Sequence, residues 1–150
     1  SLLDECVKLF IKIHDEQVIQ YTEPYYGVAD VLQTLHTKNI LMAVATNKRL
    51  SPTQKLINHF GWNEYFLFIE CSESQSEMRD KYGMIQDIIN LNLSFQGSFF
   101  VGDTVNDGLS ANLNQLPFIR ACYGYGQDQD WSKVTTFKEI NKFNEILKLI

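Results

Sequence analysis

The sequence has no apolar run long enough to cross a membrane, and its first residues lack the basic region and apolar core of a signal peptide. It also lacks an excess of positive charge, since 13 Lys and Arg stand against 18 Asp and Glu, for a formal net charge of -5. These absences argue against a membrane surface or a nucleic acid as partner. We therefore expect a cytoplasmic protein.

Cysteine is scarce as well. The chain has three cysteines, Cys6, Cys71 and Cys122, which are far apart in the sequence. An odd number without close pairs excludes a disulfide framework and does not fit the ligand spacing of a zinc site. We expect three buried thiols in a reducing compartment.

What the sequence does contain is an alternation of helical and strand-like segments. Amphipathic helical spacing occurs at 2–20, 28–38, 51–60 and 81–91, and short apolar runs occur at 40–45, 65–71, 99–101 and 118–122. The continuous run at 40–45 is typical of a parallel strand that is buried on both faces. Strands that alternate with helices predict an α/β fold with a doubly wound parallel sheet.

Two helix starts carry capping signals. Ser51 stands before Pro52, and Gln54 follows three residues after Ser51, as in a capping box. Thr136 and Glu139 have the same spacing, which predicts a helix that runs to the C-terminus.

The strand at 99–101 runs directly into Asp103 and Asp107. Ligands of open parallel sheets bind beyond the carboxyl ends of the strands, so two carboxylates at this turn can approach one cation. Hard oxygen ligands of this kind suit Mg²⁺ better than zinc. The alternative is that the two carboxylates cap the following helix at its positive end.

Two other segments bring polar groups to the same edge of the sheet. The strand at 40–45 ends in Thr46-Asn47-Lys48, and a polar loop at 72–80 precedes Lys81 at the head of a helix. A lone strand-end threonine or helix lysine is usually structural, so their roles depend on the whole set. Lys48 and its neighbour Arg49 fit a solvent-facing position equally well, and the three histidines have no partners at ligand spacing.

Together, these strand ends resemble the haloacid dehalogenase-like hydrolase superfamily, in particular its phosphoglycolate-phosphatase-like branch. Residues 43–48 are similar to the second motif of that family, Lys81 to the third, and residues 102–107 to the fourth. The segments 23–27 and 123–126 are similar to this branch too, and we expect the tyrosines of 123–126 to pack at the edge of the sheet.

The resemblance implies a Mg²⁺-dependent phosphatase that acts on a small phosphorylated metabolite. It implies that Thr46 and the Asn47 amide hold the phosphoryl group and that Lys81 pairs with its oxygens. It also implies that Asp103 ligates Mg²⁺ and that Asp107 supports the metal shell. Substrate identity and oligomeric state are not predicted.

The first motif of the family, an Asp-x-Asp sequence that supplies the nucleophile, has no match here. In the family's strand order that strand lies between those at 40–45 and 99–101, so we expect a gap in the middle of the sheet. We therefore expect the chain to be a fragment, with residues 1–22 as the last helix of a helical cap and 23–150 as an α/β core without its first strand.

Two other classes of protein were compatible with parts of this pattern. A non-catalytic relative or fragment could bind Mg²⁺, phosphate or a partner without turnover. A phospho-accepting receiver domain also has a parallel sheet, a strand-end Thr and a Lys, but it needs its acidic pair early in the chain. The acidic pair here comes after the Thr and the Lys, which disfavours the receiver domain.

Overall fold

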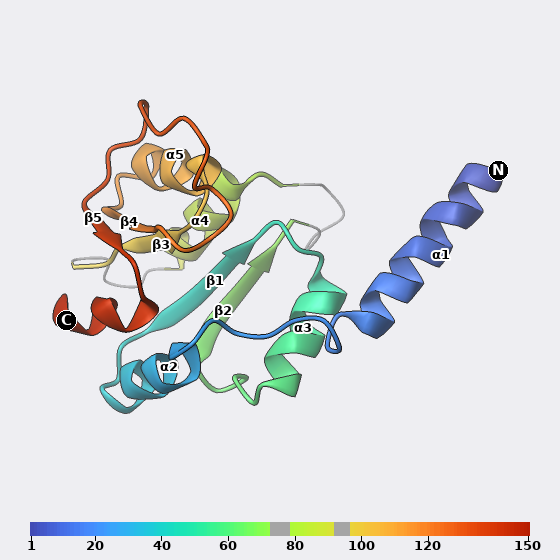
Figure 1. Ribbon diagram of the computed structural model, residues 1–150, viewed down its shortest axis with the longest axis horizontal. Coiled ribbons are helices and arrows are strands. Elements are labelled where there is room, and N and C mark those ends of the chain that lie inside the picture. The colour runs from blue at the N-terminus through green and yellow to red at the C-terminus, as the bar shows by residue number, and fades with distance from the viewer. Residues whose placement is uncertain (73–78, 92–96) are drawn as a thin grey trace.

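The structure is a computed structural model that describes residues 1–72, 79–91 and 97–150. The chain alternates helices and strands along most of its length (Figure 1). In chain order the elements are α1 (Leu2–Gln17), α2 (Val28–Thr37), β1 (Met42–Thr46), α3 (Leu50–His59), β2 (Phe66–Cys71), α4 (Lys81–Asn90), β3 (Phe100–Gly102), α5 (Val105–Leu113), β4 (Phe118–Ala121), β5 (Lys138–Ile140) and the 3₁₀ helix η1 (Phe143–Lys148). The polar loop expected at 72–80 falls mostly on 73–78, outside the described residues.

All pairings between the described strands are parallel, which confirms the α/β, Rossmann-like fold class. The strands form two sheets, β1-β2 and β3-β4-β5. In the described part of the chain no strand joins β1 to β3, the position where the sequence predicted a gap. The described strands therefore do not form a single continuous sheet, and α4 connects the two sheets by packing against β1, β2 and α5.

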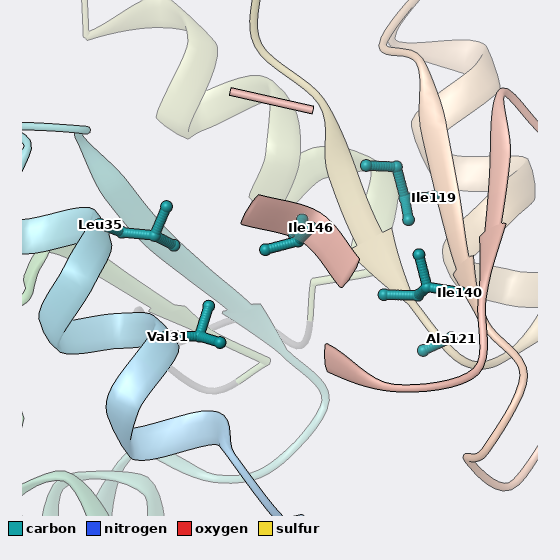
Figure 2. Close-up of a cluster of buried hydrophobic side chains, with 6 residues drawn as sticks. All are labelled: Val31, Leu35, Ile119, Ala121, Ile140 and Ile146. Carbon is teal, nitrogen blue, oxygen red and sulfur yellow. The ribbon is translucent and has the colours of Figure 1, made fainter. Parts of the chain in front are cut away.

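The buried core lies where α2 meets the three-stranded sheet. Figure 2 shows Ile146 of η1 between side chains of α2 on one side and side chains of β4 and β5 on the other. The members of this cluster are Val31, Leu35, Ile119, Ala121, Ile140 and Ile146. Because burial of each large aliphatic side chain contributes about 1.5–3 kcal/mol, η1 is a principal link between α2 and the β3-β4-β5 sheet.

The C-terminal helix predicted from Thr136 is wrong. Residues 138–140 form strand β5, which pairs with β4, and only the short η1 follows. Phe137 N donates to Phe118 O at 2.8 Å and Cys122 N donates to Ile140 O at 2.9 Å, while Ile140 is completely buried. Pairing with the edge of β4 and burial of Ile140 outweigh the local capping signal.

The first helix and the first strand also differ from expectation. Helix α1 ends at Gln17 rather than near residue 20, and none of its residues is buried. It extends away from the body of the molecule (Figure 1). Strand β1 was expected to be buried on both faces, but none of its five residues is buried. Among the described strands β1 has a partner on one edge only, so it has less cover than the central strand of a parallel sheet.

The start of α3 lies two residues before the one that the predicted capping box implies, which has Ser51 as N-cap. The helix begins at Leu50, its N-cap is Arg49, and no side chain caps it. Pro52 is accommodated in the first turn, where backbone N–H groups have no helical partner to lose.

Within the described residues, no helix is both long and apolar enough to cross a membrane. The three cysteines are free thiols, but the expectation that all three are buried is wrong: Cys71 is buried, Cys122 is half-buried, and Cys6 is exposed because it lies on α1, which buries none of its residues.

Candidate active site

The ends of β1 and β3 and the first turns of α4 and α5 meet at one open pocket of about 530 Å³. This pocket collects every site residue expected from the sequence. Its lining consists of Phe10, His14, Thr46, Asn47, Lys48, Arg49, Pro52, Lys81, Asp103, Thr104 and Asp107. Thr46 and Asp107, which are 61 positions apart in the sequence, are therefore brought to a single edge of the fold, as the parallel topology predicted.

Lys81 is a buried lysine with two polar partners. It begins α4 after the N-cap Asp80, whose carboxylate accepts from Gly83 N at 2.8 Å. The ammonium group donates to Ala45 O at 2.9 Å and lies 3.2 Å from Asp107 Oδ1. With 8% of its surface exposed, Lys81 is not a solvated helix residue. It ties the end of β1 to α5 and holds a positive charge in the pocket.

Asp107 has both carboxylate oxygens occupied. Its Oδ2 accepts from Thr104 Oγ1 at 2.7 Å, Thr104 N at 3.0 Å and Asp103 N at 3.2 Å, and its Oδ1 faces Lys81. Thr104 and Asp107 form a capping box at the start of α5, so the helix-capping alternative describes Asp107. Gly102 makes this possible, because a Cβ there would lie 2.4 Å from the Asp107 Cβ.

Asp103 is held by a loop that follows β4. Its Oδ2 accepts from Tyr125 N at 2.8 Å, and no described donor contacts Oδ1. A Cβ on Gly124 would lie 2.2 Å from Asp103 Oδ2, and one on Gly126 would lie 2.1 Å from the Asp103 carbonyl oxygen. These two glycines therefore belong to the site, although we assigned them no role from sequence. The Gly-x-Gly spacing after a strand was the available signal.

Thr46 stands at the end of β1 with its hydroxyl group towards the pocket. Its Oγ1 accepts from Lys48 N at 3.1 Å, which leaves the hydroxyl hydrogen available as a donor. The donor groups of the lining residues thus include the Thr46 hydroxyl and the Lys81 ammonium. A group of anionic oxygens is the ligand chemistry that suits them.

Helix α1 reaches the pocket at its C-terminal end, where Phe10 and His14 contribute to the lining. Asp15 Oδ1 lies 2.5 Å from Arg49 Nη2, and the backbone carbonyl of Asp15 accepts from Lys55 Nζ at 2.9 Å. Burial opposes ionisation of Asp15, but hydrogen bonds and the Arg49 guanidinium outweigh it and lower the pKa of the carboxyl. Arg49 is therefore paired rather than solvent-facing.

Tyr25 and Tyr123 form an edge-to-face pair with ring centroids 5.0 Å apart, beside Asp103. Burial, with smaller contributions from Tyr25 and the Asp103 carboxylate, raises the pKa of Tyr123 to about 12. Burial also raises the pKa of Tyr25. The pair joins the linker before α2 to the loop that holds Asp103.

We expect stability to fall between pH 10 and 12 because of Tyr123. An unfolded tyrosine ionises near pH 10.0, whereas folded Tyr123 keeps its proton to about pH 12, so ionisation favours the unfolded chain in this window. Urea unfolding at pH 9 and pH 11 measures the loss. Tyr123→Phe should reduce it, and Tyr21→Phe, at a position 73% exposed, should leave it unchanged. Equal pH dependence in wild type and Tyr123→Phe would contradict the assignment.

A parallel α/β fold that gathers a threonine, a lysine and two aspartates beyond the carboxyl ends of its strands has a Rossmann-like core. The chain belongs to the haloacid dehalogenase-like hydrolase family, which residues 2–121 match. This confirms the resemblance inferred from the motifs.

The chain is similar to curated phosphatases over part of their length. The phosphoglycolate phosphatase of Agrobacterium fabrum is 28% identical over 124 residues, which cover 82% of this chain and 53% of that protein. The phosphoglycolate phosphatase of Photobacterium profundum is 24% identical over 151 residues, which cover 100% of this chain and 66% of that protein. The chain thus spans about half to two thirds of the length of these relatives.

Solved structures of low sequence identity share the fold. A crystal structure from Clostridium difficile has a TM-score of 0.85 at 21% identity and covers 97% of this chain and 69% of that chain. The magnesium-bound structure of YfnB from Bacillus subtilis has a TM-score of 0.67 at 16% identity and covers 83% of this chain and 53% of that chain. At these identities the likeness establishes the fold alone.

Proposed function

We propose that this chain is the C-terminal part of a Mg²⁺-dependent phosphatase that hydrolyses a small phosphorylated metabolite. The observation that carries the proposal is the convergence of Thr46, Lys81 and Asp103 on one pocket. Family membership and the phosphoglycolate phosphatases among the relatives support the same reaction class. The three free cysteines agree with a cytoplasmic location, and the net charge of -5 gives no support to a nucleic acid as partner.

The residues of the pocket fit the binding of a phosphoryl group. The Thr46 hydroxyl and the Asn47 N–H would donate to its equatorial oxygens, and the Lys81 ammonium would offset their charge. In the reaction an aspartate attacks phosphorus, the alcohol leaves, and water then cleaves the aspartyl-phosphate to release inorganic phosphate. We assign that aspartate to a segment outside these 150 residues.

Asp103 fits a magnesium ligand better than Asp107 does. Asp103 offers an oxygen that no described donor occupies, whereas both oxygens of Asp107 are already bonded. No group of three or more His, Cys, Asp or Glu in the described parts of the chain could hold a metal. Mg²⁺ commonly needs only one or two carboxylates besides water and phosphate oxygens. Bound there, it would reduce repulsion between the phosphate dianion and an attacking carboxylate. Asp107 would orient Asp103 and Lys81.

The division into domains is part of the proposal. We assign residues 1–22 to the last helix of a helical cap and residues 23–150 to the α/β core without its first strand. Two observations support it: α1 buries none of its residues, and the described strands leave β1 and β3 unjoined. A strand between them would also complete the pairing of two exposed edges.

A second candidate is a non-catalytic relative that binds Mg²⁺, phosphate or a partner. What favours it is that the two pocket carboxylates have other roles: Asp107 caps α5, and Asp103 is our metal ligand. The phosphatase and the non-catalytic relative differ in phosphate-ester turnover, but both would bind Mg²⁺. A Mg²⁺-binding experiment therefore tests the property that the two candidates share.

We expect Asp103→Asn to weaken Mg²⁺ binding at least about tenfold, because it removes the one available carboxylate oxygen. Isothermal titration of the wild-type chain with Mg²⁺ should give a Kd on the order of millimolar, since a ligand from the missing segment is absent. Asp30→Asn removes an acid from the surface of α2 and should leave the Kd unchanged. Equal affinity in wild type and Asp103→Asn would remove Asp103 from the metal site.

A further inference from the structure

We propose that Ser72 is a positioning residue that orients the Thr46-Asn47 backbone so that the Asn47 N–H can bind a phosphoryl oxygen. This inference rests on the proposed function. Ser72 immediately follows β2, in a segment that the sequence predicts only as a polar loop.

Ser72 is buried and holds both carbonyl groups of the turn after β1. Its backbone N–H donates to Thr46 O at 3.1 Å, and its Oγ donates to Asn47 O at 3.0 Å. Its own carbonyl accepts from Arg79 N at 3.0 Å, which fixes Ser72 in turn. Only 7% of Ser72 is exposed, so solvent does not readily replace these bonds.

The direction of the Asn47 N–H follows from these bonds. In a trans peptide the C=O of one residue and the N–H of the next point in opposite directions. Because Thr46 C=O points to Ser72 beside β2, the Asn47 N–H points away from β2. The Ala45 carbonyl also faces away from β2, since carbonyl directions alternate along a strand, and it contacts the Lys81 ammonium. Asn47 N–H and Lys81 therefore face the same side.

The next N–H of the turn already has an acceptor. Lys48 N donates to Thr46 Oγ1 at 3.1 Å, whereas no described acceptor contacts the Asn47 N–H. Asn47 lines the pocket together with Thr46 and Lys81. A free amide, a hydroxyl and an ammonium thus face one space, and the Ser72 hydroxyl is the side-chain group that fixes the peptide after Asn47.

The test is a titration of the ¹⁵N-labelled 150-residue chain with inorganic phosphate, followed through the backbone amide resonances. In the wild type the Asn47 amide should show one of the largest saturable shifts. Ser72→Ala removes the bond to Asn47 O and should raise the phosphate Kd about fivefold, with a smaller shift at Asn47. Ser72→Thr keeps a hydroxyl group and should restore most of the affinity.

Ser110→Ala is the matched control, because Ser110 is a buried serine of α5 that does not line the pocket. It should leave the phosphate Kd unchanged. If the wild type binds phosphate with the Asn47 shift and Ser72→Ala binds equally well, the role of Ser72 is wrong while the proposed function stands. If the wild type shows no phosphate-induced shift at Asn47, both the positioning role and the phosphoryl site are overturned. Unchanged amide shifts in β3 and β4 would show that each variant keeps its fold.

Discussion

The 150-residue chain should hydrolyse a generic aryl phosphate no faster than background in the presence of Mg²⁺. Thr46, Lys81 and Asp103 can position and neutralise a phosphoryl group, but none of them is assigned as the nucleophile. An extended chain that includes an upstream apolar strand ending in Asp-x-Asp should be at least about 10⁴-fold faster, because the attacking group accounts for much of such an enzyme's acceleration. Parallel assays of both chains with and without Mg²⁺ measure the difference.

Asp103→Asn in the extended chain is the control for that assay. It should lose the Mg²⁺-dependent activity, since it keeps the nucleophile and removes the proposed metal ligand. Mg²⁺-dependent turnover by the 150-residue chain, abolished by Asp103→Asn, would contradict the account. In that case another residue of the chain would be the nucleophile, and the fragment interpretation would be wrong.

Lys81→Met should reduce the free energy of unfolding by about 3 kcal/mol. The substitution keeps the length and apolar stem of the side chain but leaves Asp107, with 10% of its side chain exposed, without its cationic partner. Removal of one member of a buried ion pair typically costs 3–5 kcal/mol, and the three remaining donors to Asp107 place this case at the lower end. Urea unfolding monitored by circular dichroism measures the change.

Lys48→Met is the matched control for Lys81→Met. Lys48 lines the same pocket, but it is only partly buried and no described carboxylate pairs with it. Its substitution should change the unfolding free energy by no more than about 0.5 kcal/mol. Equally small effects of the two substitutions would show that the Lys81–Asp107 contact contributes little to the free energy of unfolding.

Strands β1 to β4 and most helices could be predicted because their signals are local. Apolar runs marked the strands, and three-to-four-residue spacing marked helices such as α2 and α4. The site could be located for a related reason: in a parallel sheet all carboxyl ends lie at one edge, so Thr46 and Asp103 were expected to be neighbours without any knowledge of distances.

The C-terminal region could not be predicted because its structure depends on non-local pairing. The spacing of Thr136 and Glu139 satisfies a capping box, yet the open edge of β4 and the burial of Ile140 favour a strand. The exposure of β1 had the same kind of cause. Its five residues are apolar enough for a sheet interior, but their cover depends on neighbours that β1 meets on one edge only.

Within the site, the residues that line the pocket were predicted better than the role of each residue. Two roles were predicted for Asp107, and the structure places it in the capping box while also pairing it with Lys81. The contributions of backbone groups to the site were not predicted. Tyr125 holds Asp103 through its N–H, and Gly124 matters for the side chain that it lacks. A backbone N–H donor, or a glycine that leaves room for a neighbouring side chain, is difficult to recognise from a single sequence.

The central claim is that the pocket between β1 and β3 binds a phosphoryl group. A crystal structure of the chain grown with vanadate and Mg²⁺ tests it most directly. The account predicts the anion within hydrogen-bond distance of the Thr46 hydroxyl, the Asn47 N–H and the Lys81 ammonium, with the cation beside Asp103. An anion bound elsewhere, with Lys81 still bonded only to Ala45 and Asp107, would contradict the claim.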